Sequence, residues 1–188
     1  MNGGKITTFT GRHLDPLAAM PDDIDVRDIA HALALTCRFK GHCRGFYSVA
    51  EHSVRVSFHL ENPAHPDLAL WGLMHDAAEA YLADLGGPIK HRFFVQNGAA
   101  PEARFVSFGE AEDRLLEVIA ASLGFPPVDY AAVRDGDLTL LATEARDLFR
   151  IDPRTWGIDQ PPLPEALVPW TWQQAEEAFL ARFSALCP

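Results

Sequence analysis

LWGLMHDAAEAYL, residues 70–82, sets an imidazole and two carboxylates into an apolar stretch with helical character. His75 and Asp76 are adjacent, and Glu79 follows His75 by four residues, which places it on the same face of a helix. Charged groups are costly to bury unless they are paired or bind a cation. The stretch therefore predicts a bound metal ion, with further ligands supplied from elsewhere in the chain.

The composition of the whole chain is that of one globular domain. It has 188 residues, 48% of them hydrophobic, and a formal net charge of −10. The acidic balance argues against a nucleic-acid partner, because a phosphate backbone requires a basic face. No apolar run reaches the roughly 20 residues that span a bilayer, and the amino terminus lacks a signal region. We expect a cytoplasmic protein without a membrane partner, and three cysteines are too few for a disulfide framework.

Hydrophobic residues recur at helical spacing along most of the chain, which predicts an all-α bundle of roughly six or more helices. Asp25 can cap the first helix, and Ser48 with Glu51 matches a capping box for the second. No alternation typical of strands was found, and residues 1–24 and 91–100 are expected to lack regular structure. Helices are expected from about residue 25, from 48 to about 60, and over 67–82, 101–123, 129–150 and about 170–186, with a proline-rich wrapping segment at 152–169.

His52, His75 and Asp76 suit a divalent transition metal with an open coordination sphere, which is typical of catalytic sites. A lone histidine in an apolar helix is more often a core residue that bonds the backbone. Here the adjacent carboxylate and a second inward-facing histidine favour the metal. Cys37, His42 and Cys43 could join His52 in a zinc site, but their spacing is unlike that of a usual zinc motif.

A fourth ligand should come from a later helix, where Asp137 is the best candidate and Asp135 and Glu144 compete with it. Glu79 could take a proton from a reacting water, or only orient a histidine. The candidates for binding an anion are the basic residues of glycine-containing loops, Arg38, Lys40, Arg44 and Lys90. Phe39 could stack on a base or pack into the core.

Five segments, in order along the chain, resemble the motifs of the HD-domain metal-dependent phosphohydrolases, and most closely those of the bacterial 5′-deoxynucleotidase branch. The segments are Arg38-Phe39, residues 48–53 (SVAEHS), residues 75–79 (HDAAE), residues 83–90 (ADLGGPIK) and residues 133–137 (VRDGD). The resemblance covers about residues 25–150 and implies a helical HD-domain core there, within a single domain of residues 1–188.

The resemblance also implies roles for individual residues. One divalent ion (cobalt, manganese, or else zinc, iron, nickel or magnesium) would be held by His52, His75, Asp76 and Asp137. The catalytic residues would be Glu79, which acts on the attacking water, and Asp84, which lies by the sugar and recognises a deoxyribose. Arg38 and Lys90 would bind the phosphate. Phe39 stands where the family has a tryptophan beside the base, and Gly86-Gly87 replaces bulkier residues.

These features together predict a hydrolase that converts 5′-deoxynucleoside monophosphates to nucleoside and phosphate. Two alternatives are a triphosphohydrolase acting on deoxynucleoside triphosphates such as dATP, and a nucleotide-binding module without turnover. Glu79 and Asp84 argue against the last, because a pure binder needs neither. The resemblance favours a homodimer or higher homo-oligomer, in which an aromatic-rich tail could pack on its own domain or on a second subunit.

Overall fold

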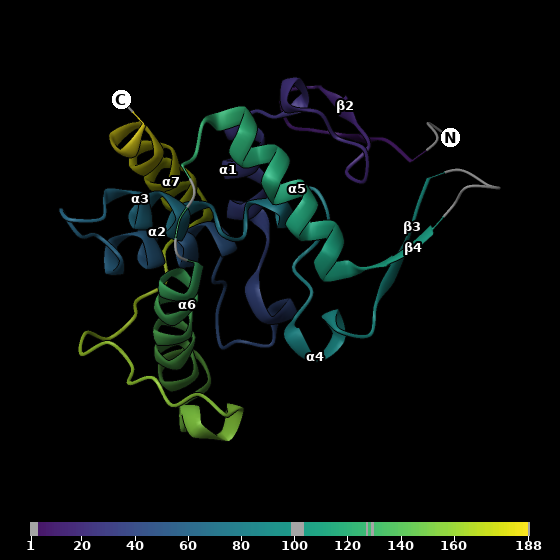
Figure 1. Ribbon diagram of the computed structural model, residues 1–188. Helices are drawn as coiled ribbons and strands as arrows, with labels where there is room; N and C mark the ends of the chain where they lie inside the picture. The colour runs from purple at the N-terminus through teal and green to yellow at the C-terminus, as the bar shows by residue number, and fades with distance from the viewer. Residues whose placement is uncertain (1–3, 99–103, 127, 129, 188) are drawn as a thin grey trace.

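The computed structural model describes residues 4–98, 104–126, 128 and 130–187. Over these residues the chain is mostly helical, with seven α-helices and two short antiparallel hairpins (Figure 1). The helices are α1 (Val26–Leu35), α2 (Val49–His59), α3 (Pro66–Met74), α4 (Gly87–Lys90), α5 (Phe108–Leu123), α6 (Tyr130–Glu144) and α7 (Trp172–Leu186). No helix in the described part of the chain is long and apolar enough to cross a membrane.

Helix α2 is the centre of the fold, because α1, α3, α6 and α7 all pack against it. Its side chains are buried from Val49 to Val54, polar ones included. Leu33 of α1, Leu73 of α3 and Phe179 of α7 are each 0% exposed in the surrounding core. Burying a side chain of this size stabilises a fold by roughly 1.5–3 kcal/mol. The polar groups of α2 are therefore held in a rigid apolar frame.

The predicted starts of the first two helices are confirmed. The Asp25 carboxylate accepts a hydrogen bond from the Arg27 N–H at 3.0 Å, and the Ser48 hydroxyl accepts one from the Glu51 N–H at 3.1 Å. The second half of the predicted capping box takes another form. The Glu51 carboxylate accepts instead from the Arg55 guanidinium and from the Trp170 N–H, the latter at 2.8 Å. Glu51 thereby attaches the start of α2 to the C-terminal part of the chain.

The predicted continuous helix over residues 67–82 is wrong. Helix α3 ends at Met74, and a separate 3-10 helix spans Ala77–Ala80. The His75 Nδ1–H donates to the carbonyl of Gly72 at 2.8 Å. In a continuing α-helix, that carbonyl would accept the hydrogen bond of the Asp76 N–H instead. The side chain of His75 thus competes with the backbone, and the chain turns at the His75-Asp76 pair.

Two hairpins form where no strand was expected. β1 (Ile6–Thr7) pairs with β2 (His13–Leu14). β3 (Phe94–Asn97) pairs with β4 (Arg104–Ser107), which replaces the expected loop at 91–100 and delays the expected helix at 101–123 to Phe108. The hairpin β3–β4 extends away from the helices in Figure 1. Pro101 and Asp129, the expected first residues of two helices, lie outside the described residues.

The remaining elements agree with the prediction. Helix α6 gives way to a π-helical turn at Ala145–Phe149, which ends the expected 129–150 helix. Residues 152–169 wrap along α6, apart from a 3-10 helix at Pro153–Trp156. This segment is fixed by side chains near the end of α6: Thr143 accepts from the Leu163 N–H at 2.9 Å, and Asp147 accepts from the Leu167 N–H at 2.8 Å.

Two glycines let α3 and α6 approach the end of α2 closely. A Cβ at Gly72 of α3 would lie 3.1 Å from the Ser57 Cα, and one at Gly136 of α6 would lie 2.7 Å from a methyl carbon of Leu60. Gly72 is three residues from His75, and Gly136 adjoins Asp137. The small residues therefore bring the helices that carry the predicted ligands up to the helix that carries His52.

Gly136→Ala should lower the free energy of unfolding by about 1–3 kcal/mol, because the added methyl group overlaps the Leu60 side chain. For a chain of this size that corresponds to a melting temperature lower by several degrees. Gly109→Ala, near the start of α5, is the matched control, since a Cβ there has nothing within 4 Å. Scanning calorimetry measures the melting temperature of both variants. Equal melting temperatures would show that the Leu60 side chain moves aside without cost.

Candidate metal centre

Two buried imidazoles are oriented so that their Nε2 atoms point into one site. His52, on α2, has its Nδ1 2.5 Å from a carboxylate oxygen of Glu144. His75 has its Nδ1 bonded to the Gly72 carbonyl. Neither Nε2 makes a hydrogen bond to any described residue, although both are buried. A hydrogen bond that fixes Nδ1 as the protonated nitrogen leaves Nε2 free to bind a metal ion.

Two carboxylates lie beside these nitrogens. An oxygen of Asp137, on α6, lies 3.0 Å from the His52 Nε2 and 3.9 Å from the His75 Nε2. An oxygen of Asp76 lies 3.3 Å from the His75 Nε2 and 4.0 Å from the His52 Nε2. The candidate ligand atoms of His52, His75 and Asp137 all lie within 4.8 Å of one another, so these three residues could hold a metal ion.

The two other acidic candidates of α6 have different places. Asp135 is exposed, and its side chain is 3.4 Å from the Gln160 amide nitrogen. Glu144 is 0% exposed and faces the far side of the His52 ring from the ligand cluster. Cys37, His42 and Cys43 form no ligand cluster within the described residues, so the alternative zinc site is absent there.

The role of Glu144 is the main feature that the sequence reasoning missed. Its carboxylate bonds His52 through one oxygen and accepts from the Arg38 guanidinium through the other, at 3.2 Å. Arg38 also donates to Asp76 at 3.3 Å. Glu144 follows Asp137 by seven residues, two helical turns, so the shared face was visible in the sequence. The contact between Glu144 and His52 could not be seen in the sequence, because the two residues are 92 positions apart.

Glu144→Gln should weaken metal binding by about 10- to 100-fold, because an amide holds the His52 ring less firmly and does not stabilise its protonated Nδ1. Isothermal titration with Mn²⁺ or Co²⁺ measures the change. Glu177→Gln, an exposed substitution on α7, is the control and should bind as the wild type does. Wild-type affinity in Glu144→Gln would mean that the carboxylate does not orient the ligand.

The charges around the cluster favour a cation at its centre. Burial and Arg38 lower the pKa of His52, but the carboxylates of Glu144 and Asp137 raise it to about 9. Burial raises the pKa of Asp76, yet His75, His52 and Arg38 together hold it far below its usual range. The pKa of Asp137 is likewise lowered, against burial, mainly by its contact with His52. The same carboxylates also raise the pKa of the two imidazoles, so a divalent ion that binds there would take the place of the Nε2 protons.

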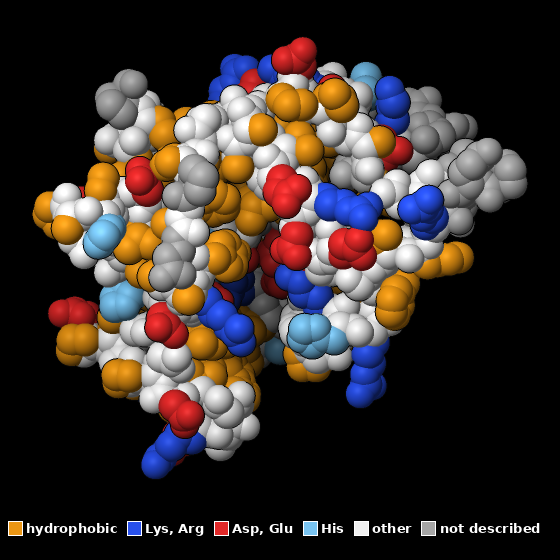
Figure 2. Space-filling model, viewed as in Figure 1, with side chains coloured by type: hydrophobic (Ala, Val, Ile, Leu, Met, Phe, Trp, Pro, Cys, Tyr) orange, Lys and Arg blue, Asp and Glu red, His pale blue; other side chains and the backbone are white. Residues whose placement is uncertain are grey.

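The cluster opens into a cavity of about 550 Å³, within the range of small-molecule sites. Figure 2 shows acidic and basic side chains gathered around a hollow in the middle of this face. Most of the predicted functional residues line the cavity, although they come from four separate stretches of the chain. The lining includes Arg38, Phe39, Asp76, Glu79, Asp84, Gly86, Gly87, Lys90, Asp137, Leu141 and Trp156.

Glu79 lies in the cavity wall on the 3-10 helix that follows Asp76, not on a continuous helix with His75. Its Oε2 is buried without a hydrogen-bond partner among the described residues. Burial, together with the charges of Asp76 and Asp84, raises the pKa of Glu79 well above the usual value. A carboxyl group with a raised pKa beside a cation site is suited to taking up a proton.

Three of the four predicted anion-binding side chains, those of Arg38, Lys40 and Lys90, are held by partners. Lys90 forms an ion pair with Glu112, a carboxylate that is only 6% exposed and whose pKa burial raises to about 7 although Lys90 lowers it. Lys40 donates to the Asp84 carbonyl at 3.0 Å. Arg44 is exposed and does not line the cavity. Arg38 and Lys90 are therefore the basic side chains at the cavity.

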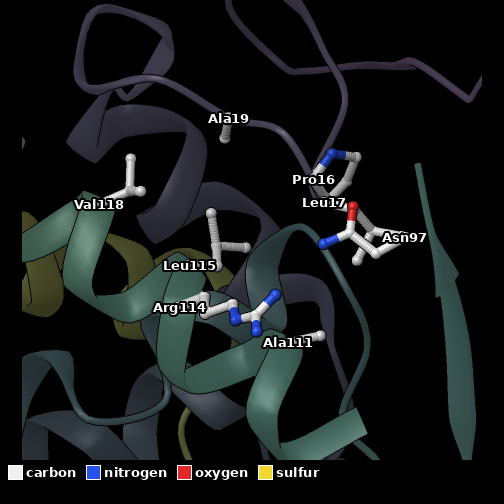
Figure 3. Close-up of a pocket in the computed structure, with 8 residues that line it drawn as sticks. All are labelled: Pro16, Leu17, Ala19, Asn97, Ala111, Arg114, Leu115 and Val118. Atoms are coloured by element: carbon white, nitrogen blue, oxygen red, sulfur yellow. The ribbon is translucent and has the colours of Figure 1, made fainter. Parts of the chain in front are cut away.

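A second, smaller hollow has no comparable chemistry. It measures about 50 Å³ and lies between α5 and the segment around Pro16 (Figure 3). Of the described residues that line it, Arg114 alone carries a charge, and its guanidinium is paired with Glu110 at 2.5 Å. This hollow therefore offers no counterpart to the carboxylates that line the larger cavity.

The fold and this cluster define a mostly helical protein with a candidate metal centre at the wall of a cavity. No family model matches the chain. The uncharacterized protein YfdR of Escherichia coli (strain K12) is 37% identical over 153 residues, which are 81% of this chain and 77% of YfdR. The chain belongs to the same family as YfdR. The uncharacterized protein RCAP_rcc00048 of Rhodobacter capsulatus is 37% identical over 132 residues, 67% of this chain and 61% of that protein.

Proposed function

We propose that the protein is a metal-dependent phosphohydrolase of the HD type that acts on 5′-deoxynucleoside monophosphates. The observation that carries the proposal is the convergence of two buried, unbonded Nε2 atoms with the carboxylate of Asp137 at the wall of a cavity. The resemblance of five ordered segments to the HD phosphohydrolases supports the assignment of the family chemistry to this site.

The donor set fits a divalent ion such as cobalt or manganese. His52, His75 and Asp137 would hold it, with Asp76 as the proposed fourth ligand; the 3.3 Å between its Oδ2 and the His75 Nε2 supports this role. When bound, such an ion polarises a phosphoryl oxygen and lowers the pKa of a water molecule. Imidazole and carboxylate donors together suit this group of metals better than they suit calcium.

Glu79 is the proposed proton acceptor. In the reaction the water oxygen bonds to phosphorus, the bond from phosphorus to the 5′ oxygen breaks, and the water proton passes to Glu79. The departing 5′ oxygen takes up a proton from a solvent water molecule and leaves as the nucleoside hydroxyl, and Glu79 then gives its proton back to the solvent. The buried position of Glu79 and its raised pKa support this role, since a base should bind a proton at a pH near that of the reaction.

Two cationic side chains, those of Arg38 and Lys90, would neutralise negative charge on the phosphate. Arg38 stays paired with Asp76 and Glu144 and contributes a fixed positive charge next to the ligands. Lys90 reaches the cavity from α4 and would exchange Glu112 for the phosphate. Asp84, which also lines the cavity, would accept a hydrogen bond from a sugar hydroxyl.

A substrate screen tests the proposal. Purified protein is stripped with a chelator, reloaded with Co²⁺ or Mn²⁺, and incubated with deoxynucleoside monophosphates, ribonucleoside monophosphates and deoxynucleoside triphosphates. Inorganic phosphate from the deoxynucleoside monophosphates, lost on chelation and restored by metal, is the expected result. Triphosphate released from dATP would assign a triphosphohydrolase instead. Binding of metal and nucleotide with no product from any substrate would identify a binding module and reject both activities.

A further inference from the structure

Part of the cavity lining is aromatic. The rings of Phe39, Phe149 and Trp156 form a compact trio: the centroids of Phe39 and Phe149 are 4.9 Å apart, those of Phe149 and Trp156 5.0 Å, and those of Phe39 and Trp156 5.7 Å. Phe39 and Trp156 both line the cavity. Two of the three rings therefore line the same cavity as Asp76 and Asp137.

Trp156 is the member of the trio with free surface. Its side chain is among the exposed apolar groups, at 39%. Phe39 is half-buried, meets the edge of Phe149, and has the Arg38 guanidinium carbon 5.2 Å from its ring centroid. The faces of Phe39 are thus partly covered by the protein itself. Of the two rings that line the cavity, Trp156 therefore offers a flat ligand group the larger exposed aromatic surface.

Trp156 is held in place by a structured turn. The 3-10 helix Pro153–Trp156 is capped by Asp152, which accepts from the Arg154 N–H at 3.0 Å. Gly157 then takes a left-handed conformation, with φ +73°, and Ile158 is buried at 4% exposure. An ordered position reduces the entropy lost when a ligand stacks on the ring.

We propose that Trp156 is the platform on which the base of the nucleotide stacks, with Phe39 supporting it from behind. The inference rests on the proposed function for the identity of the ligand, a nucleotide. A phosphate group alone fills little of a 550 Å³ cavity, and the wall made by Trp156, Phe39 and Leu141 offers apolar, planar surface in place of charge. Because every base has a π face, stacking should favour nucleotides over base-free sugar phosphates with little preference among bases.

The test compares ligands that have the base with one that lacks it. KM is measured for dAMP and for 2-deoxyribose 5-phosphate with Mn²⁺, and binding of deoxyadenosine, which has no phosphate to hydrolyse, is measured by calorimetry. Trp156→Ala should raise KM for dAMP and the dissociation constant of deoxyadenosine by about 10-fold or more, from the usual strength of base stacking. KM for 2-deoxyribose 5-phosphate should shift by less than about twofold, since that contact is absent. Trp156→Phe should restore most of the loss.

The control is Phe105→Ala on β4, which removes an aromatic side chain that is 73% exposed and does not line the cavity. If Trp156→Ala binds deoxyadenosine and dAMP as the wild type does, the inference is overturned while hydrolysis still stands. If no nucleotide is hydrolysed but Trp156→Ala still weakens deoxyadenosine binding, the inference holds and the proposed activity fails. Equal weakening for dAMP and 2-deoxyribose 5-phosphate would also overturn it, because the effect would then not concern the base.

Discussion

Asp137→Ala should abolish metal binding and hydrolysis together. Asp137 is the carboxylate nearest the His52 Nε2, at 3.0 Å, and it belongs to the cluster whose ligand atoms lie within 4.8 Å of one another. Losing a partner that only orients a ligand typically costs 10- to 100-fold in metal affinity, so losing the ligand itself should cost at least about 100-fold. Metal content after gel filtration, measured by mass spectrometry, and phosphate release are the two readouts.

Asp135→Ala is a matched control for this substitution. It removes the same group from the same helix two residues earlier, where the side chain is exposed and its partner in the described part of the chain is the Gln160 amide. It should keep its metal and its rate. Full metal occupancy in Asp137→Ala would remove Asp137 from the ligand set and leave Asp76 as the carboxylate donor.

Glu79→Gln should keep the metal and lose the rate. The amide has nearly the same shape but cannot take a proton, and removing a general base typically slows a reaction by about 10²- to 10⁴-fold. Glu79 is absent from the cluster of candidate ligands, so metal affinity should stay close to that of the wild type. The measurement is kcat at saturating dAMP, with metal content determined on the same sample.

Glu117→Gln, an exposed substitution on α5, controls for the loss of one negative charge. A Glu79→Gln variant with wild-type kcat would show that Glu79 does not accept the proton. A variant that lost both metal and rate would place Glu79 among the ligands. Comparing Glu79→Gln with Asp137→Ala thus distinguishes a residue that accepts the proton from a residue that binds the metal ion.

Local chemistry accounts for what could be predicted of the fold. The starts of α1 and α2 follow from Asp25 and Ser48, because a cap is a contact over two or three residues. The hairpin β3–β4 was missed because pairing such as that of Val95 with Val106 depends on partners apart in the sequence. The break after Met74 was missed because periodicity does not show which nitrogen of His75 bonds the backbone.

In the site, too, features that depend on neighbouring residues could be predicted, and features that depend on distant residues could not. The residue types and spacing around His75 indicated a cation, and the structure brings His52 and Asp137 to it from two other helices. Glu144 and Trp156 could not be assigned from the sequence in the same way. Each lies against a residue of a distant segment: Glu144 bonds His52, and the ring of Trp156 packs on Phe39. Only tertiary packing decides those contacts.

Because helix α7 is the last helix of the chain, the site should reach its final form only after α7 has been translated. It packs on α1, α2 and α3, and its Arg182 donates to the Ser57 hydroxyl at 2.9 Å, while that hydroxyl donates to the Ala69 carbonyl of α3. All four proposed ligands are translated before residues 172–186, yet the helix that carries His52 lacks one of its supporting faces until those residues leave the ribosome. A released chain that ends at residue 150 would contain every proposed ligand but lack this support, so we expect metal loading to follow translation of α7.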